Sequence, residues 1–527
     1  MSGHFLIRGG TVYDGATPEP RTADLRVRDG SVTEIARGLA LDGATTIDAS
    51  GTWVTPGFID AHSHCDLAAL SGQGMEGRAR AGVTTEIVGQ DGLGFAPAIG
   101  AAVDAMVDVL TPITGETPSA VWPSVRDYLQ AIDAGAFARV ATLVPHGAVR
   151  AAVMGRASRL ASATERDNMA SLTAVEMANG AVGVSTGLSY PPALWSDTEE
   201  LVQVAAAMPP GQGRYVTHLR DYGDGFDASL VEAFDIGRRS GRPVHLSHLH
   251  VSGPGRSGGA PRYLQLLESA AESGVALTWD SYPYTIACTF LRTKLPQELQ
   301  DASGSELSAL LRSSERSATV AAALDRAGPG PTVAVGWQGL YLSGLQGTPL
   351  ARWDGRSPAE IAATERSMTS GQVIVEVVRA LEGMACILVA QGHQENVVAI
   401  ATPNRHVVGS DGIPGSGVPH PRATGSFMRF LRWARDGVVD VSVGEMVARM
   451  SGRTAHLFGL PVGRLEMGAP ADVLVIDPAA LSDGPDTGAY TPSALRYSFL
   501  SGEPAIDDGC WLAPRLPALA IRGGESS

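Results

Sequence analysis

The sequence predicts an α/β protein: a (β/α)8 TIM-like barrel, with a small β-sandwich domain formed from both chain ends and an insertion before the last barrel strand. Three observations favour this fold. The chain has 527 residues, enough for a barrel of ~250 residues and an accessory domain. In its middle, short runs rich in β-branched residues alternate with Ala- and Leu-rich stretches. Near both ends, short segments alternate apolar and polar residues.

The two ends of the chain carry the strand patterns of the sandwich. We expect short antiparallel strands in HFLIRGGTVYDG, ADLRVRDGSVTEIARG and TTIDASGTWVTPG, with Asp29-Gly30 as a hairpin turn. A similar pattern returns in GRLEMGAPADVLVIDP. These could be two unrelated patches, but each alone has too few strands to bury a core. We therefore expect one sandwich built from residues 1–55 and 456–527, the latter including a C-terminal tail.

The central segment, residues 56–455, carries the barrel pattern. The expected strands are WVTPGFID, TTEIVG, VATLVP, VGVST, RYVTHL, PVHLSH, VALTWDS and HVVGSD. Over a hundred residues separate Tyr284 from His406. We expect an insertion around 287–350, because long connections in compact folds are usually functional. PTVAVGW and ACILVA could themselves be barrel strands, so the barrel register after Asp280 stays open.

Composition restricts the partners and the location. The chain has 40 Lys and Arg residues and 55 Asp and Glu residues, which gives a net charge of -15, and it has no basic cluster. Such a surface would repel a polyanion, so we expect no nucleic-acid partner. No apolar run reaches the ~18 residues of a membrane span. The four cysteines lack pairable spacing and the start of the chain lacks a basic leader, which predicts a cytoplasmic protein. A small-molecule substrate remains; the oligomeric state is left undetermined.

Histidines and one aspartate end several predicted strands. In GFIDAHSHCD, His62 and His64 project to the same side, and two imidazoles suit a divalent metal of the zinc class. Alone, they could be polar residues of a loop. His218 ends RYVTH, His248 ends PVHLSH and Asp411 ends HVVGSD. Each histidine alone could be a hydrogen-bonded structural residue. Barrel active sites form at the C-terminal strand ends, so together they predict one metal site.

This order of ligands resembles the amidohydrolase superfamily. Within it, the chain is similar to the D-aminoacylase (N-acyl-D-amino-acid deacylase) family. The similar stretches are GFIDAHSHCD, GVTTEIVGQDGLGFAP, LVPHGAVRAAVMG, THLRDYGDG, SHLHVSG, VGSDGIP and HPRATGSFMRFL, and GLPVGRLEMGAPADVLVIDP resembles the accessory β-domain. The resemblance implies zinc, as one or two ions, and hydrolysis of N-acyl-D-amino acids to a carboxylic acid and a free D-amino acid.

The resemblance also implies roles for the ligands. His62 and His64 would hold the first metal, and His218 and His248 the second. Asp411 would be the general base that takes the proton from the attacking water. The alternative is that Asp411 is a ligand without a proton role.

One position departs from the family pattern. The family usually carries Cys as a metal ligand in a G-N-C-G turn, whereas this chain reads GQDG with Asp91. A carboxylate can bind one metal or bridge two, so we predict that Asp91 is a ligand and that a two-metal site is favoured. The alternative is an Asp that only shapes a Gly-rich turn.

Substrate-binding candidates are less strongly indicated. Tyr190, Arg220 and Tyr282 stand at predicted strand ends, and an Arg could hold a substrate carboxylate, although an exposed Arg is usually just solvated. Where relatives tend to show Lys in SHxK, this chain has His250, which points to an altered acid or a substrate without one.

Two residues near the predicted site have simpler interpretations. His146 resembles a family position near the site but, as a lone residue, is expected to be structural. Strand alternation turns Cys65 away from the metal histidines, so we expect it to pack in the core.

Two other functions compete with this interpretation. A cyclic-amide hydrolase of the hydantoinase or dihydroorotase type commonly uses a carbamylated Lys, and no Lys stands at a corresponding strand end. A binding protein on a barrel that has lost catalysis would have lost metal ligands, which this chain keeps.

Overall fold

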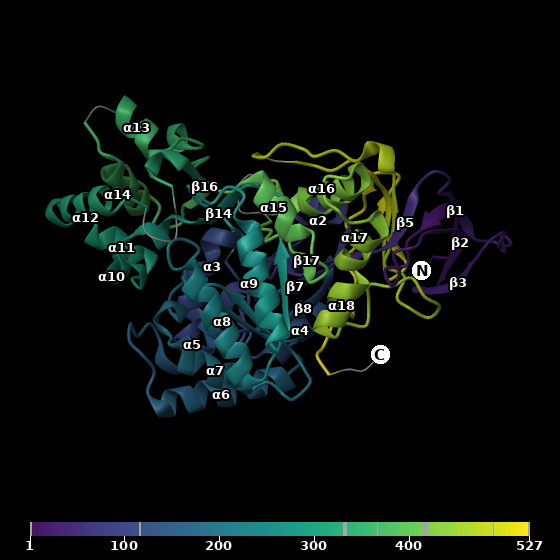
Figure 1. Ribbon diagram of the computed structural model, residues 1–527, viewed down its shortest axis with the longest axis horizontal. Helices are drawn as coiled ribbons and strands as arrows, with labels where there is room; N and C mark the ends of the chain where they lie inside the picture. Colours follow the sequence, from purple (N-terminus) through teal and green to yellow (C-terminus); the bar gives the residue numbers. More distant parts are fainter. Residues whose placement is uncertain are drawn as a thin grey trace.

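The chain has an α/β fold. The computed structural model describes residues 3–114, 117–329, 335–365, 367–414, 420–488 and 490–524. Parallel strands and their helices occupy the middle of the molecule, with β1–β3 at one end and α10–α14 at the other (Figure 1). Among the described residues, no helix combines the length and apolar character that crossing a bilayer requires.

Strands from both ends of the sequence form one sheet. In the described part of the chain this sheet has nine strands, ordered β21-β20-β19-β18-β5-β1-β2-β3, with β4 paired to β1. The strands are β1 (Phe5–Val12), β2 (Arg21–Arg28), β3 (Ser31–Ala36), β4 (Thr45–Asp48), β5 (Trp53–Pro56), β18 (Val473–Ile476), β19 (Leu495–Leu500), β20 (Glu503–Asp507) and β21 (Cys510–Trp511). Segments more than 400 residues apart in sequence therefore share hydrogen bonds, through β5 and β18.

The predicted hairpin is present, but the antiparallel prediction is only partly right. Asp29 (φ 51°) and Gly30 (φ 80°) both adopt left-handed backbone between β2 and β3, as a primed turn requires. The pairs β1–β2 and β2–β3 are antiparallel. The prediction is wrong for β4 and β5, which pair with β1 in parallel because the chain crosses back before each of them.

Parallel strands form the centre of the fold. Each of the eight runs predicted as barrel strands contains strand residues. They are β6 (Phe58–Asp60), β7 (Val83–Val88), β8 (Arg139–Thr142) with β9 (Val144–Pro145), β10 (Val184–Gly187), β11 (Tyr215–His218), β12 (Val244–Leu246), β13 (Leu277–Ser281) and β17 (His406–Val408). They pair in the orders β6-β7-β8 and β9-β10-β11-β12-β13-β17. The amide of Ala61, just after β6, donates to Val408 O in β17.

Helices connect these strands. They are α1 (Ala68–Ser71), α2 (Met75–Arg80), α3 (Ala102–Thr114), α4 (Val125–Asp133), α5 (His146–Met154), α6 (Ala163–Ala178), α7 (Thr198–Ala206), α8 (Phe226–Ser240), α9 (Ala260–Glu272), α15 (Gln394–Ala401), α16 (Arg422–Asp436), α17 (Val443–Met450) and α18 (Gly452–Phe458). Reciprocal side-chain and backbone hydrogen bonds fix the N-termini of α4 and α6, each through a serine and an acidic residue three positions later.

A separate antiparallel sheet lies between β13 and β17 in the sequence. It consists of β14 (Ile286–Phe290), β15 (Leu340–Ser343) and β16 (Cys386–Ala390), in the order β14-β16-β15. The described residues of this region also form α10 (Gln297–Gln300), α11 (Gly304–Leu310), α12 (Ser314–Ala327), α13 (Pro358–Thr364) and α14 (Ser370–Ala380). ACILVA forms β16 and is therefore not a barrel strand. Most of PTVAVGW lies outside the described residues.

Candidate metal centre

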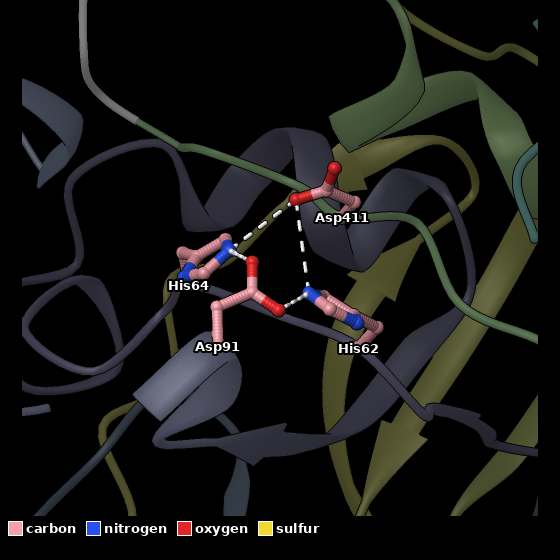
Figure 2. A group of neighbouring side chains, drawn as sticks. All are labelled: His62, His64, Asp91 and Asp411. Atoms are coloured by element: carbon pink, nitrogen blue, oxygen red, sulfur yellow. Dashed lines mark ion pairs between the residues drawn. The ribbon is translucent and has the colours of Figure 1, made fainter. Parts of the chain in front are cut away.

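Two groups of buried side chains meet at the centre of the molecule. His62, His64, Asp91 and Asp411 form one group, and Asp91 with His218 and His248 forms the other. Within each group, one potential ligand atom of every residue lies within 4.8 Å of the others. Figure 2 shows the first group, with both carboxylates turned toward the two imidazoles. The structure thus brings together all six residues that the sequence predicted as metal ligands.

Each of these residues stands at the C-terminal end of a parallel strand. His62 and His64 follow β6, and Asp91 lies in η1 (Gln90–Gly92) directly after β7. His218 is the last residue of β11, while His248 and Asp411 lie two and three residues beyond β12 and β17. Parallel strands place these ends on one side of the sheet, so ligands that are distant in sequence converge.

Three of the six residues adopt left-handed backbone. The φ angles are 56° for Asp91, 33° for His248 and 50° for Asp411. Such conformations cost of order 1–3 kcal/mol for residues other than glycine, and they cluster at active sites. The surrounding structure therefore holds these side chains in place against a local backbone preference.

The spacing within the groups fits a shared cation. His62 Nε2 lies 3.5 Å from Asp91 Oδ1, and His64 Nε2 lies 3.2 Å from Asp411 Oδ1. Two ligand atoms bound tetrahedrally at ~2.1 Å from one zinc ion would be about 3.4 Å apart. Both ring nitrogens of His62 and Asp91 Oδ1 are buried without a hydrogen-bond partner in the described structure. Buried polar atoms are rarely left so, and a divalent cation would satisfy them.

Ser189 and Tyr222 contact the ring nitrogens of His218 and His248 that point away from Asp91. His218 Nε2 lies 2.7 Å from Ser189 Oγ, and His248 Nδ1 lies 3.2 Å from the Tyr222 hydroxyl. The remaining nitrogens, His218 Nδ1 and His248 Nε2, are 2.9 Å apart and face Asp91. Outer hydrogen bonds of this kind fix the tautomer and ring orientation of metal-binding histidines.

Asp280, at the end of β13, contacts both groups. Its Oδ1 accepts the backbone N–H of His248 at 2.9 Å. Its Oδ2 lies 2.9 Å from His245 Nε2 and 3.7 Å from His62 Nδ1. This wholly buried carboxylate therefore fixes the backbone of one candidate ligand and faces the ring of another.

Burial and charge set the protonation of the ligands. Burial lowers the pKa of His218 to about 3, so its imidazole is neutral near pH 7, the form that binds metal. Burial opposes protonation of His62 as well, but the carboxylates of Asp91 and Asp280 outweigh it and raise the pKa of His62. The same His62 and the nearby His248 hold the pKa of Asp91 well below its usual value, despite its burial.

Arg422, the first residue of α16, pairs with Asp411. One guanidinium nitrogen lies 2.7 Å from Asp411 Oδ2, leaving Oδ1 directed at His64 and His62. Burial of Asp411 raises its pKa, but the charge of Arg422 outweighs burial and lowers it below the ordinary range. Asp411 is therefore ionised at neutral pH and can accept a proton.

A buried ion cluster lies beneath the site. The guanidinium of Arg78, in α2, binds Glu86 through two nitrogens at 2.9 and 2.8 Å and also bonds Asp60. Asp60 in turn accepts the backbone N–H of His62 at 3.0 Å and that of Ser410 at 2.9 Å. The cluster thereby connects β6, β7 and the segment after β17, which carry four of the six candidate ligands.

A cavity of about 890 Å³ opens beside the second group. It is lined by His218, His248 and Asp411, and Ala323, Leu324 and Val389 contribute to its apolar wall. This volume is ample for a small organic substrate.

All four predicted substrate-binding residues line this cavity. The ring of Tyr190 lies 4.7 Å from that of His218, and the ring of Tyr282 lies 4.4 Å from that of His250. Burial lowers the pKa of His250 to about 3, so it is neutral near pH 7. Arg220 forms a two-pronged ion pair with Glu232, with both bonds at 2.9 Å. Its charge is therefore already matched by a carboxylate of the protein.

The structure places His146 and Cys65 away from the metal groups. His146 is the first residue of α5, and its Nε2 lies 2.8 Å from Glu200 Oε1 in α7. Cys65 is fully buried in the hydrophobic core with Leu67 and Val88. Neither side chain belongs to the two candidate ligand groups.

Three residues of the site were not predicted from the sequence. Asp280 ends a predicted strand as the ligands do, so its position alone could have identified it. Arg422 lies in HPRATGSFMRFL, one of the stretches that resemble the family, but no role was predicted for it. Lys294 is the single lysine among 40 basic residues, and this compositional signal was available. It lies buried in the cavity wall, and burial lowers its pKa to about 7.

Comparisons with known proteins match most of the chain. The sequence model of the amidohydrolase family covers residues 45–329. The D-aminoacylase of Alcaligenes xylosoxydans xylosoxydans is 34% identical over 484 residues, which are 91% of this chain and 89% of the relative. The N-acyl-D-glutamate deacylase of that organism is 30% identical over 516 residues, 97% and 94% of the two chains. The crystal structure of an N-acyl-D-glutamate deacylase from Bordetella bronchiseptica, complexed with zinc and a phosphonate inhibitor, gives a TM-score of 0.80 at 28% identity and covers 99% of this chain and 100% of that one.

Proposed function

The chain belongs to the amidohydrolase family, and we propose that it is a zinc-dependent deacylase of N-acyl-D-amino acids. It hydrolyses the amide bond and releases a carboxylic acid and a free D-amino acid. The observation that carries this proposal is the pair of buried His/Asp groups beside an organic-sized cavity. The names of the relatives support the substrate class.

Six residues hold one or two zinc ions in this proposal. His62, His64 and Asp411 would hold the first ion, and His218 and His248 would hold the second. Asp91 belongs to both groups and would be shared between them. A bound zinc ion supplies Lewis-acid chemistry, because it activates water near neutral pH and polarises the scissile carbonyl.

Asp411 is the general base. Its carboxylate takes a proton from the attacking water and passes it to the leaving nitrogen of the amide. Arg422 keeps this carboxylate ionised before the reaction and fixes its Oδ2, so that Oδ1 is the oxygen that faces the ligand histidines.

Tyr190, Tyr282, His250 and Arg220 shape the substrate position. The neutral His250 and the ion-paired Arg220 do not bring an unmatched positive charge to the cavity. The guanidinium of Arg422 lies 5.1 Å above the ring of Tyr282, and its Nε is buried without a hydrogen-bond partner in the described structure. Arg422 also pairs with Asp411, but its Nε–H is unpartnered among the described residues, whereas every guanidinium nitrogen of Arg220 already donates within the protein. We therefore place the substrate carboxylate against Tyr282 and the Nε side of Arg422.

The finer architecture belongs to the same proposal. The parallel strands close into a (β/α)8 barrel within residues 56–455, supported by the bond from Ala61 in the segment after β6 to Val408 in β17. Residues 1–55 and 456–527 form the β-sandwich, and the segment around 287–350 is an insertion. The protein acts in the cytoplasm on a small molecule and binds neither nucleic acid nor membrane.

A substrate panel with metal analysis tests the function. Purified protein should contain zinc and release free amine, detected with ninhydrin, from N-acetyl-D-amino acids but not their L-enantiomers. Asp411→Asn should retain zinc and lose about 10²–10⁴-fold in kcat, the usual contribution of a general base. A folded, zinc-loaded protein that opens hydantoins and leaves every N-acyl-D-amino acid intact would instead establish a cyclic-amide hydrolase.

A further inference from the structure

Two cysteines that the proposed mechanism does not use lie next to each other at the edge of the metal centre. Cys288 is in β14 and Cys386 is in β16; both thiols are buried and neither is in a disulfide. In the antiparallel pairing of these strands, Cys288 lies opposite Leu388 and Phe290 lies opposite Cys386. All four side chains therefore project from one face of the sheet, with the two cysteines on a diagonal. Their thiols share a hydrogen bond.

The face that carries the two thiols looks onto the metal centre. Cys288 and Cys386 line a small cavity together with His64, Asp91 and Asp411. Cys288 also lines the larger cavity. Neither cysteine belongs to the two His/Asp groups, so the thiol pair is a separate set of donors.

A direct disulfide is not the chemistry that this arrangement favours. Diagonal residues of an antiparallel pair have Cα atoms roughly 7–8 Å apart, whereas disulfides usually span 4.4–6.8 Å. An atom bound between the sulfurs suits the spacing better. Two thiolates on one tetrahedral ion, each at ~2.3 Å, lie about 3.8 Å apart, close to the separation of two hydrogen-bonded thiols. Sulfur ligands select soft, thiophilic cations over hard ones.

The surrounding charge also favours thiolate ligands. The buried guanidinium of Arg422 donates to the backbone carbonyl of Cys288 at 3.4 Å. Its positive charge stabilises a negative sulfur nearby, and the hydrogen bond from Cys386 lowers the pKa of Cys288.

We propose that Cys288 and Cys386 form a dithiol site for soft thiophilic cations and trivalent arsenicals, and that occupancy of this site stops turnover. An arsenical RAs(OH)₂ forms two As–S bonds as two As–O bonds break. The two thiol protons leave with the hydroxyl groups as two waters, and arsenic stays trivalent. The occupant then lies beside the Arg422–Asp411 pair and the ring of Tyr190, where it obstructs the cavity. The inhibition, but not the binding, rests on the proposed function.

Phenylarsine oxide is the probe, applied to the zinc-loaded full-length protein. Native mass spectrometry should detect one phenylarsenic adduct per chain, with the zinc content unchanged. A dithiol such as 2,3-dimercaptopropanol should remove the adduct, whereas excess 2-mercaptoethanol should not. Cys288→Ser and Cys386→Ser should each raise the arsenical concentration needed for half-maximal labelling at least ten-fold. Cys510→Ser, which changes an exposed cysteine, is the matched control and should label like the wild type.

Labelling and activity have separate outcomes. Full labelling of either Ser variant, loss of zinc on labelling, or an unlabelled wild type would overturn the dithiol site, whatever the enzyme hydrolyses. A labelled wild type that keeps its deacylase activity would overturn the inhibition and leave no role for the site in turnover. If no deacylase activity is found at all while the adduct forms as expected, the proposed function fails and the dithiol site stands.

Discussion

Asp280 should control metal affinity although it is not itself a predicted ligand. Asp280→Asn keeps the shape of the side chain but replaces one acceptor oxygen with an NH₂ group. The side chain then cannot accept from both the backbone of His248 and the ring of His245, which it contacts at 2.9 Å each. It also loses the negative charge that faces His62 Nδ1.

The size of this effect follows from the contacts. Loss of one hydrogen bond to a charged group costs about 1.5–3 kcal/mol. At ~1.4 kcal/mol per tenfold change in an equilibrium constant, this corresponds to roughly 10–100-fold weaker metal binding. The same range is typical when an outer partner of a ligand histidine is removed.

Competition between the apoprotein and a fluorescent zinc chelator measures the affinity. The matched control is Asp472→Asn, which also neutralises a buried carboxylate but lies next to β18, paired with Arg139. The control should lower stability and leave zinc affinity unchanged. A zinc Kd for Asp280→Asn within two-fold of the wild type, in a folded protein, would refute the assignment of Asp280 as the residue that positions the ligands.

Three further predictions concern single residues of the site. Asp91→Ala should lower bound zinc and activity together, because Asp91 belongs to both ligand groups; a full zinc content with normal turnover would remove it from the ligand set. Arg78→Met should lower the free energy of unfolding by about 3–5 kcal/mol in urea, because it leaves two buried carboxylates without their cation; an unchanged urea midpoint would contradict this. Burial lowers the pKa of Lys294 from 10.5 to about 7, so between these values the unfolded chain binds the extra proton and wild-type stability rises with pH. Lys294→Met should therefore stabilise the protein most at pH 7 and below, by up to about 5 kcal/mol, and the gain should vanish toward pH 10.5; a gain independent of pH would show that the lysine is not buried as a neutral amine.

The positions of five of the six candidate ligands could be predicted because they depend on a local rule. A β-branched run ending in His or Asp places that residue at the C-terminal end of a strand, and parallel strands bring such ends together. Each histidine became a candidate only as part of this set, and Asp91 was predicted from the resemblance of its turn to the family pattern. The eight strand runs were found for the same reason, since hydrophobic runs between helical stretches are a strong signal.

Contacts between distant segments had no local signal. Arg422, at the start of α16, forms an ion pair with Asp411. Cys288 and Cys386 are nearly a hundred residues apart in sequence and lie on neighbouring strands of a sheet whose pairing no periodicity indicates. ACILVA illustrates the same limit. A buried apolar run predicts a strand, but not whether its neighbours are parallel or antiparallel. The parallel pairing of β4 and β5 with β1 was missed for this reason.

The structure indicates how Asp91, which stands where the family pattern has Cys, would differ from a thiolate as a metal ligand. Both of its oxygens face candidate ligands: Oδ1 lies 3.5 Å from His62 Nε2, and Oδ2 lies 3.7 Å from His64 Nε2 and 3.6 Å from His248 Nε2. A thiolate would offer a single sulfur to the two groups, whereas a carboxylate would offer two oxygens. It also offers a harder donor, which weakens the preference for soft ions. The left-handed backbone at Asp91 shows that the turn is held in this orientation at a cost. Because Asp91 belongs to both groups, this harder donor supports the proposal that the site takes two zinc ions.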